Sequence, residues 1–264
     1  MLILITSLGR AARQKAVAQI PEALHPFVRF FTQEAEADAY RQHLPSTIEV
    51  ITLPDDTDGI AQTRQRAIDA IPKGKVWVID DLCTFKIRHL SNDGITYTLL
   101  SDEGFIELYE RVSRHLDKFI QVGISSHNGN NRILERSVIN NRSYSTYGLR
   151  TDVMHRANIR FDAMYEQNKE CKYMEDFYIT LDALAKGYAN VVLYDYCFLY
   201  PHNTQGGNST NRTLKGHNAS AVELQRRFPA FVKLKQKAGS WGTQQMDART
   251  EVVIQWKKAF KSKL

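Results

Sequence analysis

Short apolar runs of strand length alternate with segments of helical periodicity along most of the chain. The runs lie at residues 2–5, 27–31, 48–53, 75–79 and 120–124. Between them, apolar positions recur three and four residues apart, which is the period of an amphipathic helix. This alternation favours an open α/β sheet over an all-β or all-α fold.

Helices are expected between these strands at residues 11–20, 34–43, 60–71 and 101–119. A later helix is predicted from residue 175, because apolar residues recur there at spacings of four, three and four. Gly187 is its natural C-terminal stop.

Two more strands and a hairpin complete the pattern. Two strand-like runs at residues 85–90 and 95–100 flank Gly94, which predicts a β-hairpin that leaves the main sheet. Further strands are expected at residues 147–154 and 191–200.

The composition supports a folded core and a basic C-terminal part. Of 264 residues, 43% are hydrophobic and 10% aromatic, so general disorder is excluded. The net charge is +6, and residues 212–264 hold twelve lysines and arginines against three acidic residues. We expect helices there with a cationic outer face, which serves either as a solvated surface or as a contact for a polyanion.

The cysteines and the apolar runs indicate a soluble protein of a reducing compartment. Cys83, Cys171 and Cys197 are odd in number and widely spaced, so they form neither a disulfide framework nor a zinc pattern. Residues 2–5 predict a strand rather than a signal peptide, and no run is long enough to span a bilayer. The expected location is the cytoplasm.

Two adjacent carboxylates, Asp80 and Asp81, end the apolar run at residues 75–79. Chemistry in α/β sheets gathers where strands end, because the loops there are exposed while the strands hold them rigid. Such a pair can hold a hard divalent cation that neutralises a phosphate. An acidic turn without function is the ordinary alternative.

Cationic and hydroxyl side chains in two other places suit a nucleotide. The first strand ends in a loop containing Thr6, Ser7 and Arg10, and Arg64 lies one turn inside the predicted helix at residues 60–71. Each arginine is either a surface cation or a donor to an anion near the strand ends.

A polar loop at residues 125–132 follows the strand at 120–124. Its hydroxyl, amide and guanidinium groups can bind a polyhydroxyl or phosphorylated ligand, or form a mobile polar loop. The candidate contacts are Ser126, Asn128, Asn131 and Arg132.

Glu175 and Asp176 lie at the start of the late helix. Acidic residues are favourable at that end of the helix dipole, and a carboxylate fixed there can also act as a general base. Residues 201–210, which include His202, are rich in polar residues and glycine, as in a segment that orders over a ligand.

In this order, Asp80-Asp81, Glu175-Asp176 and His202 resemble the motifs of a GT-A glycosyltransferase. The resemblance implies a Rossmann-like mixed sheet flanked by helices. It also implies Mn²⁺ or Mg²⁺ bound by a carboxylate and by the diphosphate of a sugar nucleotide, with a late histidine in the metal shell. A second carboxylate at a helix start would face the acceptor.

Residues 122–132, 174–177 and 186–188 are more narrowly similar to the TET/JBP-associated glycosyltransferases, over roughly residues 1–210. That family implies transfer from a UDP-sugar to 5-hydroxymethylcytosine or 5-hydroxymethyluracil in DNA, and both bases stay open here. Leu82 departs from the pattern, because a third aspartate is common at its position.

The resemblance assigns roles to these residues. Asp176 or Glu175 would be the base, Asp81 would bind the metal with help from His202, and Asp80 would contact the ribose. Arg10 and Arg64 would assist on the nucleotide. Residues 1–211 would form the catalytic domain, and the basic extension at 212–264 would hold the DNA backbone.

Two other functions remain in competition. A GT-A enzyme with a polysaccharide, lipid or protein acceptor would share the donor site. A non-catalytic nucleotide-sugar or DNA-binding module would make the separated carboxylate motifs a coincidence. A nucleoside-triphosphate hydrolase is disfavoured, since the sequence has no Walker-type glycine loop.

Overall fold

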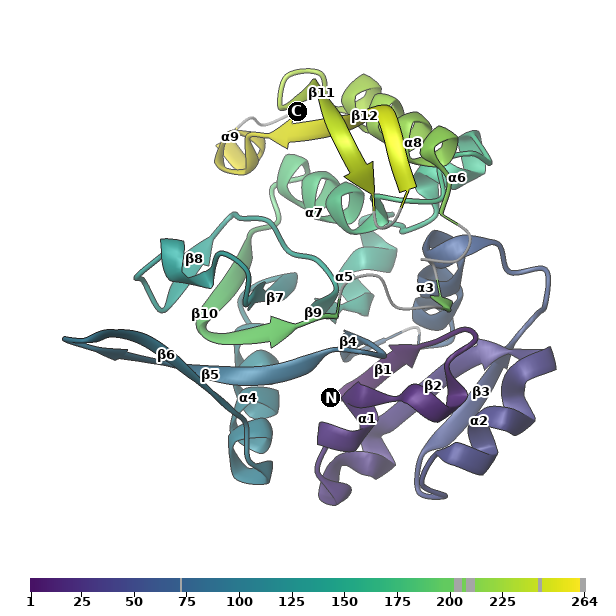
Figure 1. Cartoon of the computed structure of the whole chain (residues 1–264), viewed down its shortest axis with the longest axis vertical. Coiled ribbons are helices and arrows are strands. Elements are labelled where there is room, and N and C mark those ends of the chain that lie inside the picture. Colours follow the sequence, from purple (N-terminus) through teal and green to yellow (C-terminus); the bar gives the residue numbers. More distant parts are fainter. Residues whose placement is uncertain (72, 202–205, 208–211, 242–243, 262–264) are drawn as a thin grey trace.

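The computed structural model describes residues 1–71, 73–201, 206–207, 212–241 and 244–261. Within them, a ten-stranded mixed sheet has helices on both faces, and a separate two-stranded sheet lies near the C-terminus (Figure 1). The prediction of a mixed α/β sheet flanked by helices is confirmed.

The elements follow the predicted alternation of strands and helices. The strands are β1 (Leu2–Thr6), β2 (Val28–Gln33), β3 (Glu49–Leu53), β4 (Lys75–Asp80), β5 (Thr84–Ser91), β6 (Gly94–Leu99), β7 (Gln121–Ser126), β8 (Ser137–Ile139), β9 (Thr146–Arg150), β10 (Asn190–Leu199), β11 (Val232–Trp241) and β12 (Gln244–Ile254). The α-helices are α1 (Lys15–Gln19), α2 (Ala37–His43), α3 (Gly59–Asp69), α4 (Asp102–His115), α5 (Thr151–Arg156), α6 (Ala163–Gln167), α7 (Glu175–Ala185), α8 (Leu214–Arg227) and α9 (Trp256–Lys261). Short 3₁₀ turns are η1 (Ala11–Arg13), η2 (Glu22–Phe27), η3 (Glu34–Glu36) and η4 (Asn130–Arg132).

The order of the strands brings several carboxyl ends to one edge of the large sheet. The order is β3-β2-β1-β4-β9-β7-β10-β5-β6, with β8 beside β10. Strands β1 to β4 are mutually parallel, and β9 is antiparallel to both β4 and β7. Because β10 is parallel to β7, the strands β1, β4, β7 and β10 all end at the same edge.

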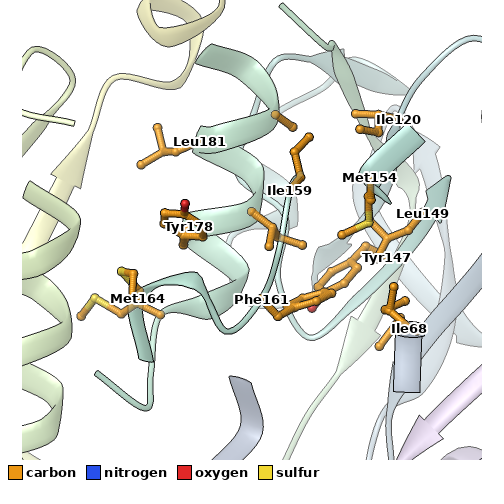
Figure 2. Close-up of a cluster of buried hydrophobic side chains, with 14 of the residues drawn as sticks. Ile68, Ile120, Tyr147, Leu149, Met154, Ile159, Phe161, Met164, Tyr178 and Leu181 are labelled. Atoms are coloured by element: carbon orange, nitrogen blue, oxygen red, sulfur yellow. The ribbon is translucent and has the colours of Figure 1, made fainter. Parts of the chain in front are cut away.

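Alternate residues of the central strands serve two separate cores. Leu4 and Val78 face one cluster, while Ile5 and Trp77 face the other, as the two-residue period of a strand requires. Figure 2 shows part of the first cluster, in which side chains of α7 and of the chain before it pack against the sheet. Helices α1, α2 and α4 cover the opposite face. A sheet covered on both faces explains why its central strands are continuous apolar runs.

The structure differs from the predicted elements in two places. The strand expected at 147–154 ends at Arg150, and residues 151–156 form α5. Helices alone were expected after residue 212, but α8 and α9 flank the ribbon β11–β12. Val232 and Leu234 are therefore strand residues, and Figure 1 shows this extension stacked beyond α7.

The predicted hairpin forms, and it is continuous with the main sheet. Strand β5 pairs antiparallel with β10, and β6 then forms the outer edge. The hairpin begins at the carboxylate edge, because Thr84 of β5 is paired with Leu199 of β10.

Candidate active site

The predicted motifs converge on the edge where the parallel strands end. Thr6 of β1 is the register partner of Asp80 in β4, and Ser126 of β7 is the partner of Phe198 in β10. Neighbouring strands lie about 4.8 Å apart, so β7 ends about 10 Å from β4, across β9. The loop after β1, the aspartate pair and the polar loop after β7 therefore lie along one edge.

Arg64 links the end of β4 to the start of α7. Its Nη2 donates to Oδ1 of Asp80 at 2.5 Å, and its Nη1 donates to Oε1 of Glu175. The guanidinium also lies 5.6 Å from the centre of the Tyr147 ring. The Arg64 side chain is only 4% exposed, so this cation neutralises two carboxylates away from water. The alternative of an ordinary surface cation is wrong.

Glu175 and Asp176 begin α7 after an unusual backbone conformation. Met174, which precedes them, has a φ of +62°, a left-handed value that a bulky side chain rarely adopts. Burial raises the pKa of Glu175 to about 7, although the Arg64 charge opposes this shift. Burial also raises the pKa of Asp176, against the charges of Arg64 and Arg142. A carboxylate whose pKa lies near neutrality is suited to accept a proton.

Asp81 belongs to a second buried network. Arg10 Nη1 donates to its Oδ1 at 2.9 Å, and Ser7 Oγ donates to its Oδ2 at 2.6 Å. The Ser7 hydroxyl also bonds the Tyr40 hydroxyl at 2.8 Å. The carbonyl oxygen of Asp81 accepts from the amide of Lys15 at the start of α1. With both carboxylate oxygens bonded to protein donors, Asp81 fixes the loop after β1.

Asp80 has more freedom to meet a ligand than Asp81. Its side chain is 19% exposed, whereas Asp81 is 3% exposed as a residue. Only Oδ1 of Asp80 has a hydrogen-bond partner among the described residues. Its second oxygen fits a divalent cation that takes most of its ligands from phosphate and water.

Two glycines cover Arg10. Arg10 Nη2 donates to the Gly206 carbonyl at 2.6 Å, and the Gly207 amide donates to the Leu8 carbonyl at 2.7 Å. A Cβ at Gly206 would lie 2.8 Å from Arg10 Cγ and 2.8 Å from the Gly9 oxygen. Only glycines allow this close approach, since both also have positive φ values. His202, the expected metal ligand from this segment, lies outside the described residues.

The polar loop after β7 is organised by a residue that was not singled out. Asn130 is fully buried, and its Nδ2 donates to the Tyr194 carbonyl at 2.9 Å while its Oδ1 accepts from Tyr97. Buried Arg88 binds the carbonyls that follow in the loop. The predicted contacts Asn128, Asn131 and Arg132 are exposed, and Ser126 is half-buried. Thr6 is buried at the end of β1.

Arg142 is a further candidate that the sequence did not reveal. It is exposed, and its guanidinium carbon lies 4.1 Å from the centre of the Tyr144 ring and 4.6 Å from that of Phe177. It adds a second positive charge near Asp176. No spacing marks this residue in the sequence, because only the fold brings residue 142 to the start of α7.

Two absences hold for the part of the chain that the structure describes. No group of three or more His, Cys, Asp or Glu side chains is arranged there to hold a metal ion. Among the same residues, no helix is long and apolar enough to cross a membrane.

The mixed sheet with its carboxylate edge has the GT-A-like fold of nucleotide-sugar glycosyltransferases. The structure of TarS 1-349 from S. aureus in complex with UDP-GlcNAc superimposes with a TM-score of 0.50 at 15% identity, over 85% of this chain and 67% of TarS. GalNAc-T7 with UDP, GalNAc and Mn²⁺ gives a TM-score of 0.52 at 8% identity, over 85% and 47%. At such low identities these similarities show the fold alone.

The sequence places the chain within this class. The model of the TET-Associated Glycosyltransferase family matches residues 1–208, so the chain belongs to this family and the predicted resemblance is confirmed. The Beta-glucosyl-HMC-alpha-glucosyl-transferase of Enterobacteria phage T6 is 24% identical over 247 residues, covering 88% of this chain and 82% of the phage protein. The protein of the same name from phage T2 gives the same values.

Proposed function

We propose that the protein transfers a sugar from a UDP-sugar to the hydroxymethyl group of a modified pyrimidine in DNA. The observation that carries this proposal is the Arg64 bridge between Asp80 and Glu175. Asp80 lies at the end of a strand and is suited to the donor. Glu175 lies with Asp176 at the start of a helix, where a carboxylate is suited to the acceptor, and Arg64 bonds both Asp80 and Glu175. Membership of the TET-associated family supports a modified base as the acceptor.

The donor would occupy the edge between β1 and β4. The Arg10 loop, with Ser7 and Asp81 behind it, would meet the nucleotide. Half-buried Ser126 and exposed Asn128, Asn131 and Arg132 would border the sugar and acceptor. Asp80 is the carboxylate whose geometry best supports metal binding, with His202 as a further ligand. The expectation that Asp81 binds the metal stays a prediction. Mn²⁺ or Mg²⁺ there would neutralise the leaving diphosphate.

Asp176 would accept the proton of the hydroxymethyl group. The hydroxyl oxygen forms a bond to C1 of the sugar as its O–H proton passes to the carboxylate. The bond between C1 and the diphosphate oxygen breaks, and its electron pair leaves with UDP. Glu175, bonded to Arg64, would hold the start of α7 in place. A base that deprotonates the acceptor favours inversion of configuration at C1. A product with retained configuration would therefore rule out Asp176 as this base.

The extension supplies charge that suits a DNA backbone. Lys233, Lys235 and Lys237 are exposed at alternate positions of β11, so they share one face of the ribbon. Their spacing along the strand is about 6.8 Å. That distance is about two phosphate steps of one DNA strand when these are measured along the helix axis.

The names of the phage relatives add a second acceptor. They indicate alpha-glucosyl transfer to beta-glucosyl-HMC, so a glucosylated hydroxymethyl base is an alternative to the bare hydroxymethyl group. Polysaccharide, lipid and protein acceptors have no comparable support.

Mass spectrometry of DNA after incubation with a panel of UDP-sugars and Mn²⁺ tests the proposal. The DNA would contain hydroxymethylcytosine, hydroxymethyluracil, glucosylated hydroxymethylcytosine or unmodified bases. We expect a hexose mass on one modified base only, lost in Asp176→Asn. Transfer that Asp176→Asn leaves intact, or indifference to all four DNAs, would refute it.

A further inference from the structure

Arg142 lies at the acceptor side of the site and has no role in the assignments above. Phe177, one of its two ring partners, directly follows Asp176 in α7. The other ring, Tyr144, precedes Ser145, whose carbonyl accepts from the Asp80 amide at 3.2 Å. One ring partner of Arg142 is thus adjacent in the chain to Asp176, and the other is adjacent to a residue that is bonded to Asp80.

The backbone that carries Arg142 is fixed in place. Asn190, which is fully buried, donates from Nδ2 to the Asn141 carbonyl at 2.7 Å and accepts the Asn141 amide at 2.9 Å. The amide of Asn140, where φ is +54°, donates to the Asn190 carbonyl at 2.9 Å. A loop held in this way loses little further conformational freedom when it binds a ligand.

The two rings are themselves supported from behind. Tyr144 makes an edge-to-face contact with buried Phe198 at 5.3 Å between ring centres. Phe177 makes one with Trp256 at 5.8 Å, and Trp256 begins α9 in the C-terminal extension. The extension thus contributes to holding the Arg142 guanidinium against its rings.

The Arg142 guanidinium has no hydrogen-bond acceptor within the described residues, in contrast to Arg10 and Arg64. Arg10 and Arg64 are each bonded to an aspartate. A planar cation that is held by aromatic rings but not bonded to a carboxylate presents its donors to a ligand. Bidentate binding of a phosphate is the chemistry that suits such a group.

Two phosphates could meet Arg142: the donor's diphosphate or a phosphate of the acceptor strand. The predicted nucleotide loop follows β1, on one side of β4, whereas Arg142 belongs to the segment before β9, on the other side. We propose that Arg142 binds the backbone phosphate next to the acceptor nucleotide and so directs the hydroxymethyl group toward Asp176. This inference rests on the proposed function.

The test compares acceptors with and without the phosphate. Transfer is measured to a free hydroxymethyl nucleoside and to the same nucleoside inside a trinucleotide, at the alkaline plateau of the pH profile. In Arg142→Ala, we expect the ratio of the two kcat/KM values, trinucleotide over nucleoside, to fall about 10- to 100-fold, as for loss of a charge-assisted pair. Arg142→Lys keeps the charge but lacks the planar fork, so its ratio should lie between that of Arg142→Ala and that of the unaltered protein.

Arg114→Ala is the matched control, because Arg114 is an exposed arginine of α4 with only a 3.9 Å contact to Glu110. Its ratio should equal that of the unaltered protein. A rise in the KM for the donor, or an equal loss on both acceptors, would overturn the inference and assign Arg142 to the donor. Failure of the unaltered protein to modify either acceptor would instead refute the proposed function, and the inference with it.

Discussion

Arg64 donates a 2.5 Å hydrogen bond to Asp80 and thereby connects the end of β4 to the helix α7, whose Glu175 binds the other terminal nitrogen. These three residues are 16 and 111 positions apart in the chain. The strand end and the helix start are therefore bridged by one buried cation that is bonded to both carboxylates.

Replacing Arg64 with methionine should destabilise the protein strongly. Asp80 and Glu175 would lose the cation that bridges them, and breaking a buried ion pair typically costs about 3–5 kcal/mol. Urea denaturation measures the change in the free energy of unfolding. Arg66→Met is the matched control on the same helix, since Arg66 pairs with the exposed Asp56 and such pairs contribute about 1 kcal/mol or less. Equal losses in the two variants would contradict a central role for the Arg64 bridge.

Asp80→Asn and Asp81→Asn should fail in different ways. Asp80 has an oxygen without a protein donor, so its variant should require at least about tenfold more Mn²⁺ for half-maximal transfer, a loss of about 1.4 kcal/mol. Asp81→Asn removes the carboxylate beside buried Arg10, so its main effect should be a lower Tm. Metal titrations and thermal melts distinguish the two. The reverse pattern would support Asp81 as the metal ligand, as the sequence predicts.

The fold was largely predictable because its information is local. Apolar runs set the strands β1, β4 and β7, and the motif order gave the GT-A resemblance. The site was predictable only in part. The motifs Asp80-Asp81 and Glu175-Asp176 were visible, but the buried state of Asp81 depends on Ser7 and Arg10, which reach it from another strand. Asn130 and Arg142 act through tertiary contacts, so no spacing in the sequence reveals them.

The ribbon β11–β12 was missed for a related reason. The apolar residues Phe228, Phe231, Val232 and Leu234 recur at spacings that fit a helix. In the structure Pro229 follows the end of α8, and the alternation of lysines from residue 233 matches the period of a strand instead. The two periods overlap over this short stretch, and pairing with β12 decides between them.

Activity and stability should respond in opposite directions to pH. Burial raises the pKa of Glu175 from 4.5 to about 7 and also raises that of Asp176, so both carboxyl groups keep a proton to higher pH than exposed ones do. Transfer should therefore increase with pH as Asp176, the proposed base, loses its proton above the usual range of an aspartate. The folded state binds the Glu175 proton more tightly than the unfolded state does, so the free energy of unfolding should decrease as the pH rises from 4.5 to about 7.

Glu175→Gln tests this assignment. The variant keeps an oxygen for Arg64 but has no proton to release, so the loss of stability between these pH values should diminish. Removing the neighbouring negative charge should also move the activity profile toward lower pH. Glu166→Gln, an exposed change on α6, should alter neither curve. A profile in Glu175→Gln identical to that of the unaltered protein would show that another group titrates.

Gly206→Ala should weaken donor binding through Arg10. Gly206 has a φ of +87°, and the new Cβ would lie 2.8 Å from Arg10 Cγ and 2.8 Å from the Gly9 oxygen. Gly187→Ala is a close control, because Gly187 has a φ of +82° but no atom within 4 Å of an added Cβ. Both variants should lose about 1 kcal/mol of stability from backbone strain. Only Gly206→Ala should raise the KM for the UDP-sugar, and a similar rise in both would refute a role for this contact.

Removing the lysine row should reduce the salt dependence of DNA binding. If Lys233, Lys235 and Lys237 each neutralise a phosphate, their triple replacement by alanine should lower the slope of log K against log salt by about 3. Affinity should fall equally for modified and unmodified duplexes, because backbone contacts carry no information about the base. The control removes Lys73, Arg114 and Lys118, three exposed cations distant from the ribbon in sequence. An unchanged slope in the Lys233, Lys235 and Lys237 variant, measured by fluorescence anisotropy across a salt series, would exclude β11 as the DNA contact.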